Sequence, residues 1–295
     1  MPDQAFRLRF LAQQVPPVRP AARDLRVVAV SSGKGGVGKT NIAVNLGILL
    51  TRLGRRVLLL DADVGLANVE VLLNIAPRHT LRDVLFGDRT LADVVVRTPY
   101  GLRIISGGSG FTEMANLDAS QRARVLGMLQ GLGDIADFIF IDTGAGISRN
   151  VIGFLAAAGD VIVVVTPEPT SMTDAYALIK VLARHGVVPG VSLVVNRVAS
   201  GEEGLETARR METAVGRFLN FRVNYLGYVY DDPAVGRAVR VQEPLVVAFP
   251  EAPAARCLEL VAGRLAGETG AVPGGRDPGP GNGFIQRLAR IFRLG

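Results

Sequence analysis

One short run near the start of this 295-residue chain constrains its fold more than any other feature. The mostly apolar run Val27–Ser31 leads into Ser32-Gly33-Lys34-Gly35-Gly36-Val37-Gly38-Lys39-Thr40, and a helical pattern follows from Asn41 to Arg52. Glycines in such a loop let backbone N–H groups approach phosphate oxygens, and the start of the helix adds partial positive charge. A strand, a glycine-rich loop and a helix start in this order predict a phosphate-binding loop.

Two side chains at the end of the loop have predicted roles of their own. Lys39 can reach the β- and γ-phosphates of a nucleoside triphosphate, and the Thr40 hydroxyl can bind Mg²⁺. We therefore expect a triphosphate and Mg²⁺ as cofactors. The residues predicted to contact the nucleotide from this segment are Gly33, Gly35, Gly36, Val37, Gly38, Lys39, Thr40 and Asn41.

Short β-branched apolar runs alternate with helical patterns from Arg26 to about Gly267. Continuous apolar strands between helices are typical of a parallel sheet that is covered on both faces. We expect a doubly wound α/β domain with a mainly parallel sheet of seven or eight strands, helices on both faces and right-handed crossovers. Ligands of such sheets bind at the carboxyl ends of the strands. The expected strands are Arg26–Ser31, Arg56–Leu60, Leu102–Ile105, Phe138–Ile141, Val161–Val165, Val191–Val195 and Tyr225–Val229.

Acidic residues come directly after two of the expected strands: Asp61 and Asp63 after the second, and Asp142 after the fourth. Carboxylates at this edge of a sheet, beside a phosphate site, can hold Mg²⁺ or order an attacking water. We assign Thr40, Asp61 and Asp142 to the metal site. Gly144 can present its backbone N–H to the γ-phosphate, so its loop can sense hydrolysis.

The loop also carries an earlier lysine, Lys34, which is not needed to hold phosphate within one subunit. With it the loop reads Lys-Gly-Gly-x-Gly-Lys-Thr and resembles that of the deviant-Walker family of MinD and ParA ATPases. The resemblance implies an ATP hydrolase that binds ATP or ADP with Mg²⁺ and forms a face-to-face homodimer in the ATP state. It assigns catalytic roles to Lys34, Lys39, Asp63 and Asp142, with Lys34 reaching the partner's nucleotide and Asp63 positioning the attacking water.

Two further strand ends resemble nucleotide-base contacts of that family. Asn196 and Arg197 follow the strand at Val191–Val195, and the matching Asn of the family binds adenine. An Asn amide offers a donor and an acceptor, which suits the edge of the adenine ring. By the same resemblance, Thr166–Ser171 lies near the dimer interface and Asp231–Pro233 passes the base.

The ends of the chain differ from its middle in composition. We expect residues 1–20 to form a helix and a Pro-rich linker, 21–267 the ATPase domain, 268–283 a flexible tether, and 284–295 an amphipathic helix. Bulky apolar residues share one face of the last helix and arginines line the other, as in interfacial membrane anchors. A terminal helix docked on the chain's own surface is the alternative. The residues predicted to contact an anionic membrane are Phe284, Ile285, Leu288, Ile291 and Phe292.

The N-terminal segment Asp3-Gln4-Ala5-Phe6-Arg7-Leu8-Arg9 matches the Asp-Gln-Ala-x-x-Leu-Arg motif of the FlhG family, also called YlxH or FleN. Members of this family regulate flagellar number, and Gly110–Asn116 resembles another of their segments. The resemblance implies stimulation of the GTPase FlhF through Asp3, Gln4, Leu8 and Arg9. It also implies contacts with C-ring components of the flagellar basal body and control of flagellar number and placement.

Composition narrows the remaining alternatives. No apolar run reaches the length of a transmembrane helix and no secretory signal is visible, so we expect a cytoplasmic protein that binds the inner face of the cell membrane in its ATP state. The single cysteine, Cys257, argues against an iron–sulfur carrier.

Two alternatives stay open: a MinD-type regulator of the septum site, against which the N-terminal motif counts, and a ParA-type partition protein, against which the C-terminal helix counts. No specific nucleic-acid binding is expected, although the net charge is +6.

Overall fold

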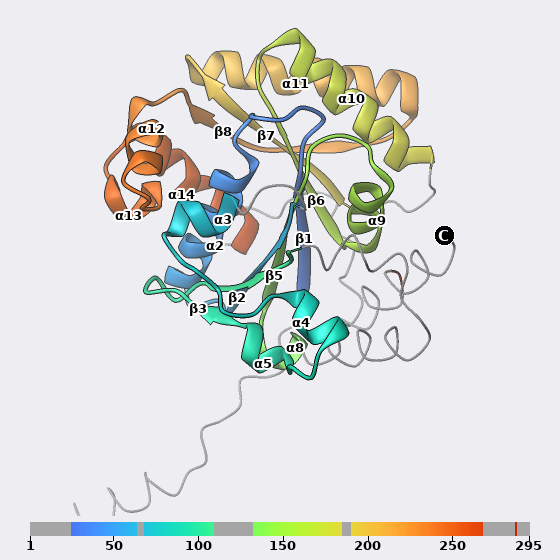
Figure 1. Ribbon diagram of the computed structural model, residues 1–295. Coiled ribbons are helices and arrows are strands. Elements are labelled where there is room, and N and C mark those ends of the chain that lie inside the picture. Colours follow the sequence, from blue (N-terminus) through green and yellow to red (C-terminus); the bar gives the residue numbers. More distant parts are fainter. Residues whose placement is uncertain (1–24, 64–67, 109–131, 185–189, 268–286, 288–295) are drawn as a thin grey trace, which may run out of the picture.

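An eight-stranded sheet forms the centre of the protein (Figure 1). The structure is a computed structural model and describes residues 25–63, 68–108, 132–184, 190–267 and Arg287. The strand order is β3-β4-β2-β5-β1-β6-β7-β8, and only the short β3 runs antiparallel to its neighbour. The strands are β1 (Arg26–Ser31), β2 (Val57–Ala62), β3 (Val96–Arg97), β4 (Arg103–Ser106), β5 (Phe138–Thr143), β6 (Asp160–Val165), β7 (Gly190–Val198) and β8 (Val223–Tyr230).

Helices cover both faces of the sheet. Successive strand residues point to opposite faces, so Val27 and Ala29 of β1 belong to one apolar core and Val28 and Val30 to the other. The first core lies under α4 (Leu81–Phe86), α5 (Leu91–Val94), α8 (Leu132–Ile135), α9 (Arg149–Ala157), α10 (Pro169–Arg184) and α11 (Gly201–Leu219). The second lies under α2 (Lys39–Arg52), α3 (Asn68–Leu73), α12 (Pro233–Arg240), α13 (Leu245–Ala248) and α14 (Pro253–Ala266).

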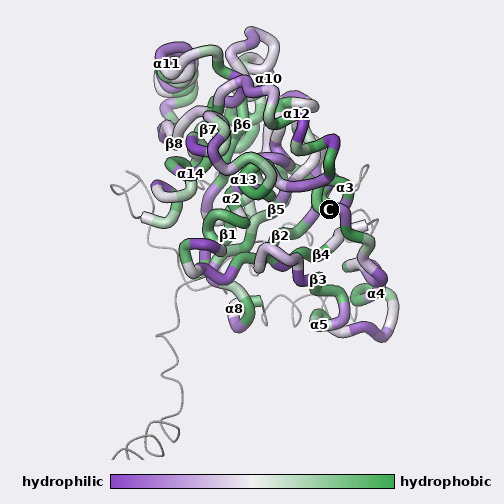
Figure 2. The backbone as a smooth tube through the Cα atoms, turned by 90° about the vertical axis from the view of Figure 1, so that its left-hand side faces the viewer, coloured by the Kyte–Doolittle hydropathy of each residue, from purple (hydrophilic) through white to green (hydrophobic). Residues whose placement is uncertain are grey.

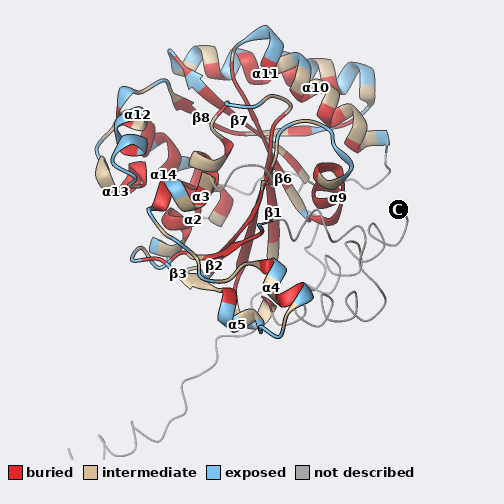
Figure 3. Cartoon of the chain, in the orientation of Figure 1, coloured by how far each residue is buried: buried red, intermediate tan, exposed pale blue. Residues whose placement is uncertain are grey.

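The central strands are buried along most of their length, as continuous apolar runs require. Figure 3 shows them almost wholly in the colour of buried residues, and Figure 2 shows them as mainly hydrophobic. The long helix α11 is mainly hydrophilic in the same view, because only one of its sides meets the sheet. Among the described residues, no helix has the length and apolarity needed to cross a membrane.

The expected doubly wound α/β architecture is confirmed, and all seven expected strands are present with small shifts of their ends. The eighth strand, β3, was not foreseen, because two residues cannot display the alternation that marks a strand. Asp61 and Asp142, predicted at the carboxyl ends of their strands, are each the second-to-last residue of a strand. Both lie inside β2 and β5 and stand opposite each other in the parallel ladder, because pairing of the backbone continues to Ala62 and Thr143.

Candidate functional site

The glycine-rich loop joins the carboxyl end of β1 to the start of α2, which begins at Lys39 rather than at Asn41. Two of its glycines are required by their surroundings. A Cβ at Gly33 would lie 2.1 Å from the backbone carbonyl carbon of Asp174 in α10. Gly38 has a left-handed φ of 95°, and a Cβ there would lie 2.5 Å from Nδ2 of Asn196. The loop is thus held between α10 and the end of β7.

Two buried side chains meet beside this loop. Lys39 is only 8% exposed, and its positive charge partly offsets the rise in the pKa of the Asp142 carboxyl that burial causes. The Thr40 hydroxyl, next in the chain, acts in the same direction. Gly35 and Gly36 form the exposed tip of the loop, where no other atom would meet an added Cβ. The loop is therefore open on the side from which a phosphate group can enter.

Asp142 is completely buried, and neither of its carboxylate oxygens accepts a well-formed hydrogen bond among the described residues. Burial raises its pKa to about 6, and the Thr40 hydroxyl and the Lys39 ammonium only partly offset this effect. Burial also raises the pKa of Asp61 to about 7, and the negative charge of Asp142 adds to the effect. Carboxylate and hydroxyl oxygens suit Mg²⁺, which commonly takes one or two carboxylates together with substrate phosphates. Asp142 and Thr40 therefore fit a magnesium site.

Asp63 lies just beyond the end of β2 and faces the loop that follows β5. Its Oδ1 would be 3.3 Å from a Cβ placed on Gly144. The same loop is tied to the phosphate loop, because the N–H of Gly146 donates to the carbonyl of Ser32 at 2.9 Å. Asp63, Gly144 and the phosphate loop thus surround one space, as a water-positioning carboxylate and a γ-phosphate contact require.

Lys34 differs from the buried Lys39 in being partly exposed and ion-paired. Its Nζ donates to Oε2 of Glu168 at 2.8 Å and to Oγ1 of Thr170 at 3.1 Å. This pairing lowers the pKa of the Glu168 carboxyl. The Lys34 side chain remains 40% exposed, so it can leave the pair for another anion. The sequence did not reveal Glu168 and Thr170 as its partners, because no spacing rule connects a loop after β1 with one after β6.

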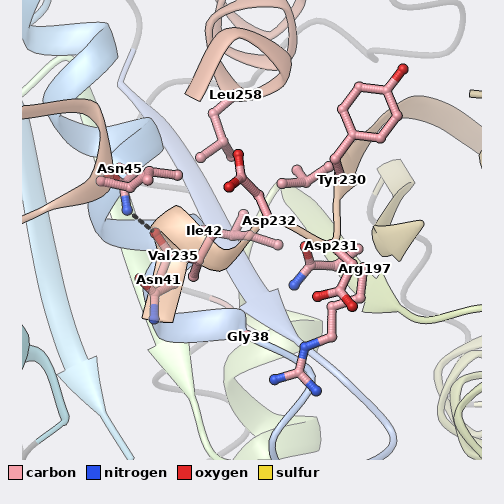
Figure 4. A pocket seen from close by; sticks show the side chains of 13 residues that line it. Gly38, Asn41, Ile42, Asn45, Arg197, Tyr230, Asp231, Asp232, Val235 and Leu258 are labelled. Atoms are coloured by element: carbon pink, nitrogen blue, oxygen red, sulfur yellow. Dashed lines mark hydrogen bonds between the residues drawn. The ribbon is translucent and has the colours of Figure 1, made fainter. Parts of the chain in front are cut away.

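A pocket opens next to Gly38, where Figure 4 shows Asn41, Ile42 and Asn45 on one wall and residues from the ends of β7 and β8 on the other. Asn196 lines this pocket, and its Nδ2 donates to the carbonyl of Val37 at 2.7 Å. That bond fixes the amide, so its oxygen is left to accept from a ligand.

The outer wall of the pocket contains both predicted and unforeseen residues. Arg197 lies there in a left-handed conformation with a φ of 58°, which is strained for an arginine. Tyr230 was missed because the expected strand ended at Val229, one residue short. Asp231 and Asp232 line the pocket; that this segment passes the base stays a prediction.

Asp232 also has a structural role that explains its position. One carboxylate oxygen accepts the N–H of Ala234 at 2.8 Å, at the start of α12. The other accepts the N–H of Ala254 at 3.2 Å, at the start of α14. Asp232 therefore shapes the pocket by joining the starts of two helices.

The predicted sites at the two ends of the chain lie outside the described residues. These are Asp3, Gln4, Leu8 and Arg9 at one end and Phe284, Ile285, Leu288, Ile291 and Phe292 at the other; the segment Gly110–Asn116, in the middle of the chain, also lies outside the described residues. Arg287 is described, and its Nε donates to the carbonyl of Ala157 at the end of α9 at 3.0 Å. Partial burial lowers the pKa of this guanidinium. One residue of the C-terminal segment therefore contacts the α/β domain.

Comparison with known proteins agrees with this geometry. The profile of the CobQ/CobB/MinD/ParA nucleotide binding domain matches residues 28–245, which include the phosphate loop and all residues that line the pocket except Leu258. The chain belongs to this family. It is 42% identical over 241 residues to the antiactivator FleN of Pseudomonas aeruginosa, covering 82% of this chain and 86% of FleN. It is 32% identical over 252 residues to the flagellum site-determining protein YlxH of Helicobacter pylori, covering 84% and 85%.

Solved structures lead to the same family. The septum site-determining protein MinD of Pyrococcus horikoshii, in complex with Mg-ADP, matches with a TM-score of 0.66 and 26% identity over 82% of this chain and 98% of that one. MinD of Aquifex aeolicus, in a MinC:MinD complex, matches with a TM-score of 0.66 and 25% identity over 83% and 97%. The predicted kinship with MinD and ParA proteins, and with FleN and YlxH, is therefore confirmed. The chain is a nucleotide-binding protein of the MinD/ParA ATPase type.

Proposed function

We propose that this protein is an ATP-driven switch in flagellar regulation. ATP joins two copies face to face, the dimer binds the inner face of the cell membrane, and hydrolysis separates the copies again. The observation that carries the proposal is the different environment of two lysines in one loop. Lys39 is buried beside Asp142, whereas Lys34 is directed outward onto Glu168. The relatives FleN and YlxH, an antiactivator and a flagellum site-determining protein, support the flagellar role.

The phosphate end of the site supports hydrolysis of the β–γ bond. The N–H groups of the loop and Lys39 bind the phosphates, and Thr40 and Asp142 would hold Mg²⁺, which when bound would neutralise charge that develops on them. Asp63 orients a water toward the γ-phosphorus, and the N–H of Gly144 holds a γ-oxygen. The position of Asp63 over Gly144 supports this assignment. Excluding bulk water from this buried edge strengthens each of these interactions.

The base end of the site favours adenine. Because one N–H of the Asn196 amide donates to the carbonyl of Val37, the amide is held in an orientation in which its oxygen can accept a hydrogen bond from the base. Adenine has an exocyclic amino group to donate, whereas guanine has a carbonyl oxygen at the corresponding position. Asn41 and Arg197 complete the contacts of the nucleotide at the mouth of this pocket.

Dimerisation links the site to the ends of the chain. Once Lys34 leaves Glu168, it can reach a phosphate of the nucleotide in a second copy. Two copies carry two C-terminal segments, and such avidity can raise membrane affinity by roughly 10²–10⁴-fold without a new contact. On this proposal Phe284, Ile285, Leu288, Ile291 and Phe292 enter the membrane. Asp3, Gln4, Leu8 and Arg9 then stimulate FlhF, and the dimer meets C-ring components of the basal body.

Sedimentation with anionic liposomes tests the proposal directly. We expect the protein to sediment with the liposomes in ATP and to stay in solution in ADP or without nucleotide. A chain truncated after Gly283 should still hydrolyse ATP yet stay in solution. If the truncated chain sediments as well as the full chain, the C-terminal segment is not the anchor.

A second assay separates flagellar regulation from regulation of the septum site. Purified FlhF should hydrolyse GTP faster when a peptide of residues 1–14 is added. A peptide in which Gln4 and Arg9 are replaced by alanine is the matched control. An FlhF rate that neither peptide changes would favour the MinD-type alternative.

A further inference from the structure

The carboxylate of Asp61 interacts with backbone N–H groups of the segment that follows β2. It is the second-to-last residue of β2 and only 5% exposed. Its Oδ1 accepts the backbone N–H of Asp63 at 3.1 Å, and the backbone N–H of Val69 lies close enough to the carboxylate to offset in part the rise in its pKa that burial causes. Val69 is the second residue of α3. One carboxylate therefore joins the end of β2 to the start of α3.

The surroundings of Asp61 reinforce this junction. Its backbone carbonyl accepts the N–H of Gly107, just beyond β4, at 3.0 Å. The next residue of α3, Glu70, accepts the hydroxyl of Ser106, the last residue of β4. The start of α3 is thus attached to the carboxyl ends of two neighbouring strands through two carboxylates.

Asp142 differs from Asp61, although the two stand opposite each other on neighbouring strands. Both oxygens of Asp142 lack a well-formed hydrogen bond among the described residues, whereas Oδ1 of Asp61 accepts one from the N–H of Asp63. A hydrogen bond from an N–H group uses one of the roughly four lone-pair sites of a carboxylate and fixes the orientation of the side chain. Of the two buried carboxylates, Asp142 therefore has more acceptor sites left for Mg²⁺.

We propose that Asp61 is a positioning residue that holds Asp63 over Gly144, and that it is not a metal ligand. Its carboxylate accepts the N–H of Asp63 and lies close to the N–H of Val69. It thereby holds in place the backbone that carries the Asp63 side chain. This revises the sequence-based assignment of Asp61 to the metal site. The inference rests on the proposed function, since it gives Asp61 a task within the hydrolysis site.

Amide hydrogen exchange in the nucleotide-free protein tests the junction itself. Asp61→Asn keeps the shape of the side chain, but its NH₂ group would face one of the two N–H donors. We expect the amides of Asp63 and Val69 to exchange roughly tenfold faster or more, because a hydrogen bond to a charged acceptor is lost. Asp142→Asn is the matched control and should leave both amides unchanged. Asp61→Glu keeps the charge but displaces the oxygens, so it should raise the exchange rates as well and serves if Asp61→Asn does not fold.

A Mg²⁺ titration of ATP binding, followed with a fluorescent ATP analogue, tests the second half of the inference. Asp142→Asn should raise the Mg²⁺ midpoint by about tenfold or more, and Asp61→Asn by less than about threefold. The inference is overturned if Asp61→Asn shifts the midpoint as far as Asp142→Asn, or if it leaves the two amides unchanged. Because exchange is measured without nucleotide, a wild-type protein that failed to hydrolyse ATP would refute the proposed function and leave this result standing.

Discussion

The two ends of the candidate nucleotide site are built in different ways. At the phosphate end, Asp61 and Asp142 lie in the middle of the sheet, Lys39 begins α2, and all three are almost fully buried. At the base end, Arg197 lies near the end of β7 and Asp231 follows β8, at one side of the sheet, and both are exposed. The charged groups of the phosphate end therefore lie where water is largely excluded, so each electrostatic interaction there is strong. The base end is proposed to bind an adenine ring that stays partly solvated, so each contact contributes less to the binding free energy.

The largest effect should come from the buried lysine. Lys39→Ala removes the only buried cation described at the phosphate end, and we expect ATP affinity to fall by about 100-fold or more. Fluorescent-nucleotide titration measures this. Lys34→Ala is the matched control within the same loop, and should bind ATP normally while failing to dimerise in size-exclusion chromatography. Equal losses of ATP affinity in the two variants would show that the two lysines do not have separate roles in ATP binding and dimerisation.

Asp63→Ala should separate turnover from binding. Without its carboxylate the attacking water is no longer oriented, and we expect the steady-state ATPase rate to fall by roughly 10²–10⁴-fold. ATP affinity should stay within about threefold of the wild type, because Asp63 faces Gly144 and not the phosphate loop. The variant should accumulate as a dimer in ATP. Normal turnover would remove Asp63 from the mechanism.

The buried carboxylate of Asp142 should make the nucleotide-free protein less stable at neutral pH than at acidic pH. Its pKa is raised from 3.8 to about 6 in the fold, so the folded state binds the proton more tightly than the unfolded state. This contribution to stability is fully present below about pH 4 and is lost as the pH rises toward about 6.

Replacing Asp142 by a neutral amide removes that pH dependence. At pH 7.5, Asp142→Asn should be more stable than the wild type by up to about 3 kcal/mol, and the difference should vanish near pH 4. Urea unfolding at both pH values, without nucleotide or Mg²⁺, measures the free energy of unfolding. A gap of the same size at both pH values would mean that burial of the charge is not its cause.

The smallest effect should come from the base end. Asn196→Ala removes one neutral hydrogen bond, so we expect ATP affinity to fall by only about three- to tenfold, with a turnover rate near that of the wild type. The preference for ATP over GTP should fall by a similar factor. Competition binding with both nucleotides measures the ratio. Asp231→Asn, on the exposed rim of the same pocket, is the control and should leave the ratio unchanged.

The contrast between the two ends also explains what could be predicted from the sequence. At the phosphate end, the loop, the strands and the carboxylates at their ends are local patterns, and the structure brings Lys39, Thr40, Asp63 and Asp142 together. The carbonyl that orients Asn196 belongs to Val37, far away in the chain. Contacts of this kind have no local signal, because they arise only when separate strand ends meet.

The same limit applies to the roles of individual carboxylates. Asp61, Asp142 and Asp232 look alike in the sequence, since each stands at or near the carboxyl end of an apolar strand. The structure separates them by their hydrogen bonds. Asp232 joins two helices, Asp61 is bound by backbone N–H groups, and Asp142 has no well-formed hydrogen bond among the described residues.

The place of β1 in the sheet has a consequence for the protein's synthesis. Among the described strands β1 is made first, yet its partners are β5 and β6, with Arg26 opposite Phe138 and Val28 opposite Asp160. A ribosome adds about 5–20 residues per second, so the first of these partners appears roughly 6–20 s after β1. During this interval the apolar residues of β1 lack both neighbours in the sheet. A nascent chain thus cannot form the nucleotide site until more than half of it has been translated, and ATP can stabilise only the nearly finished domain.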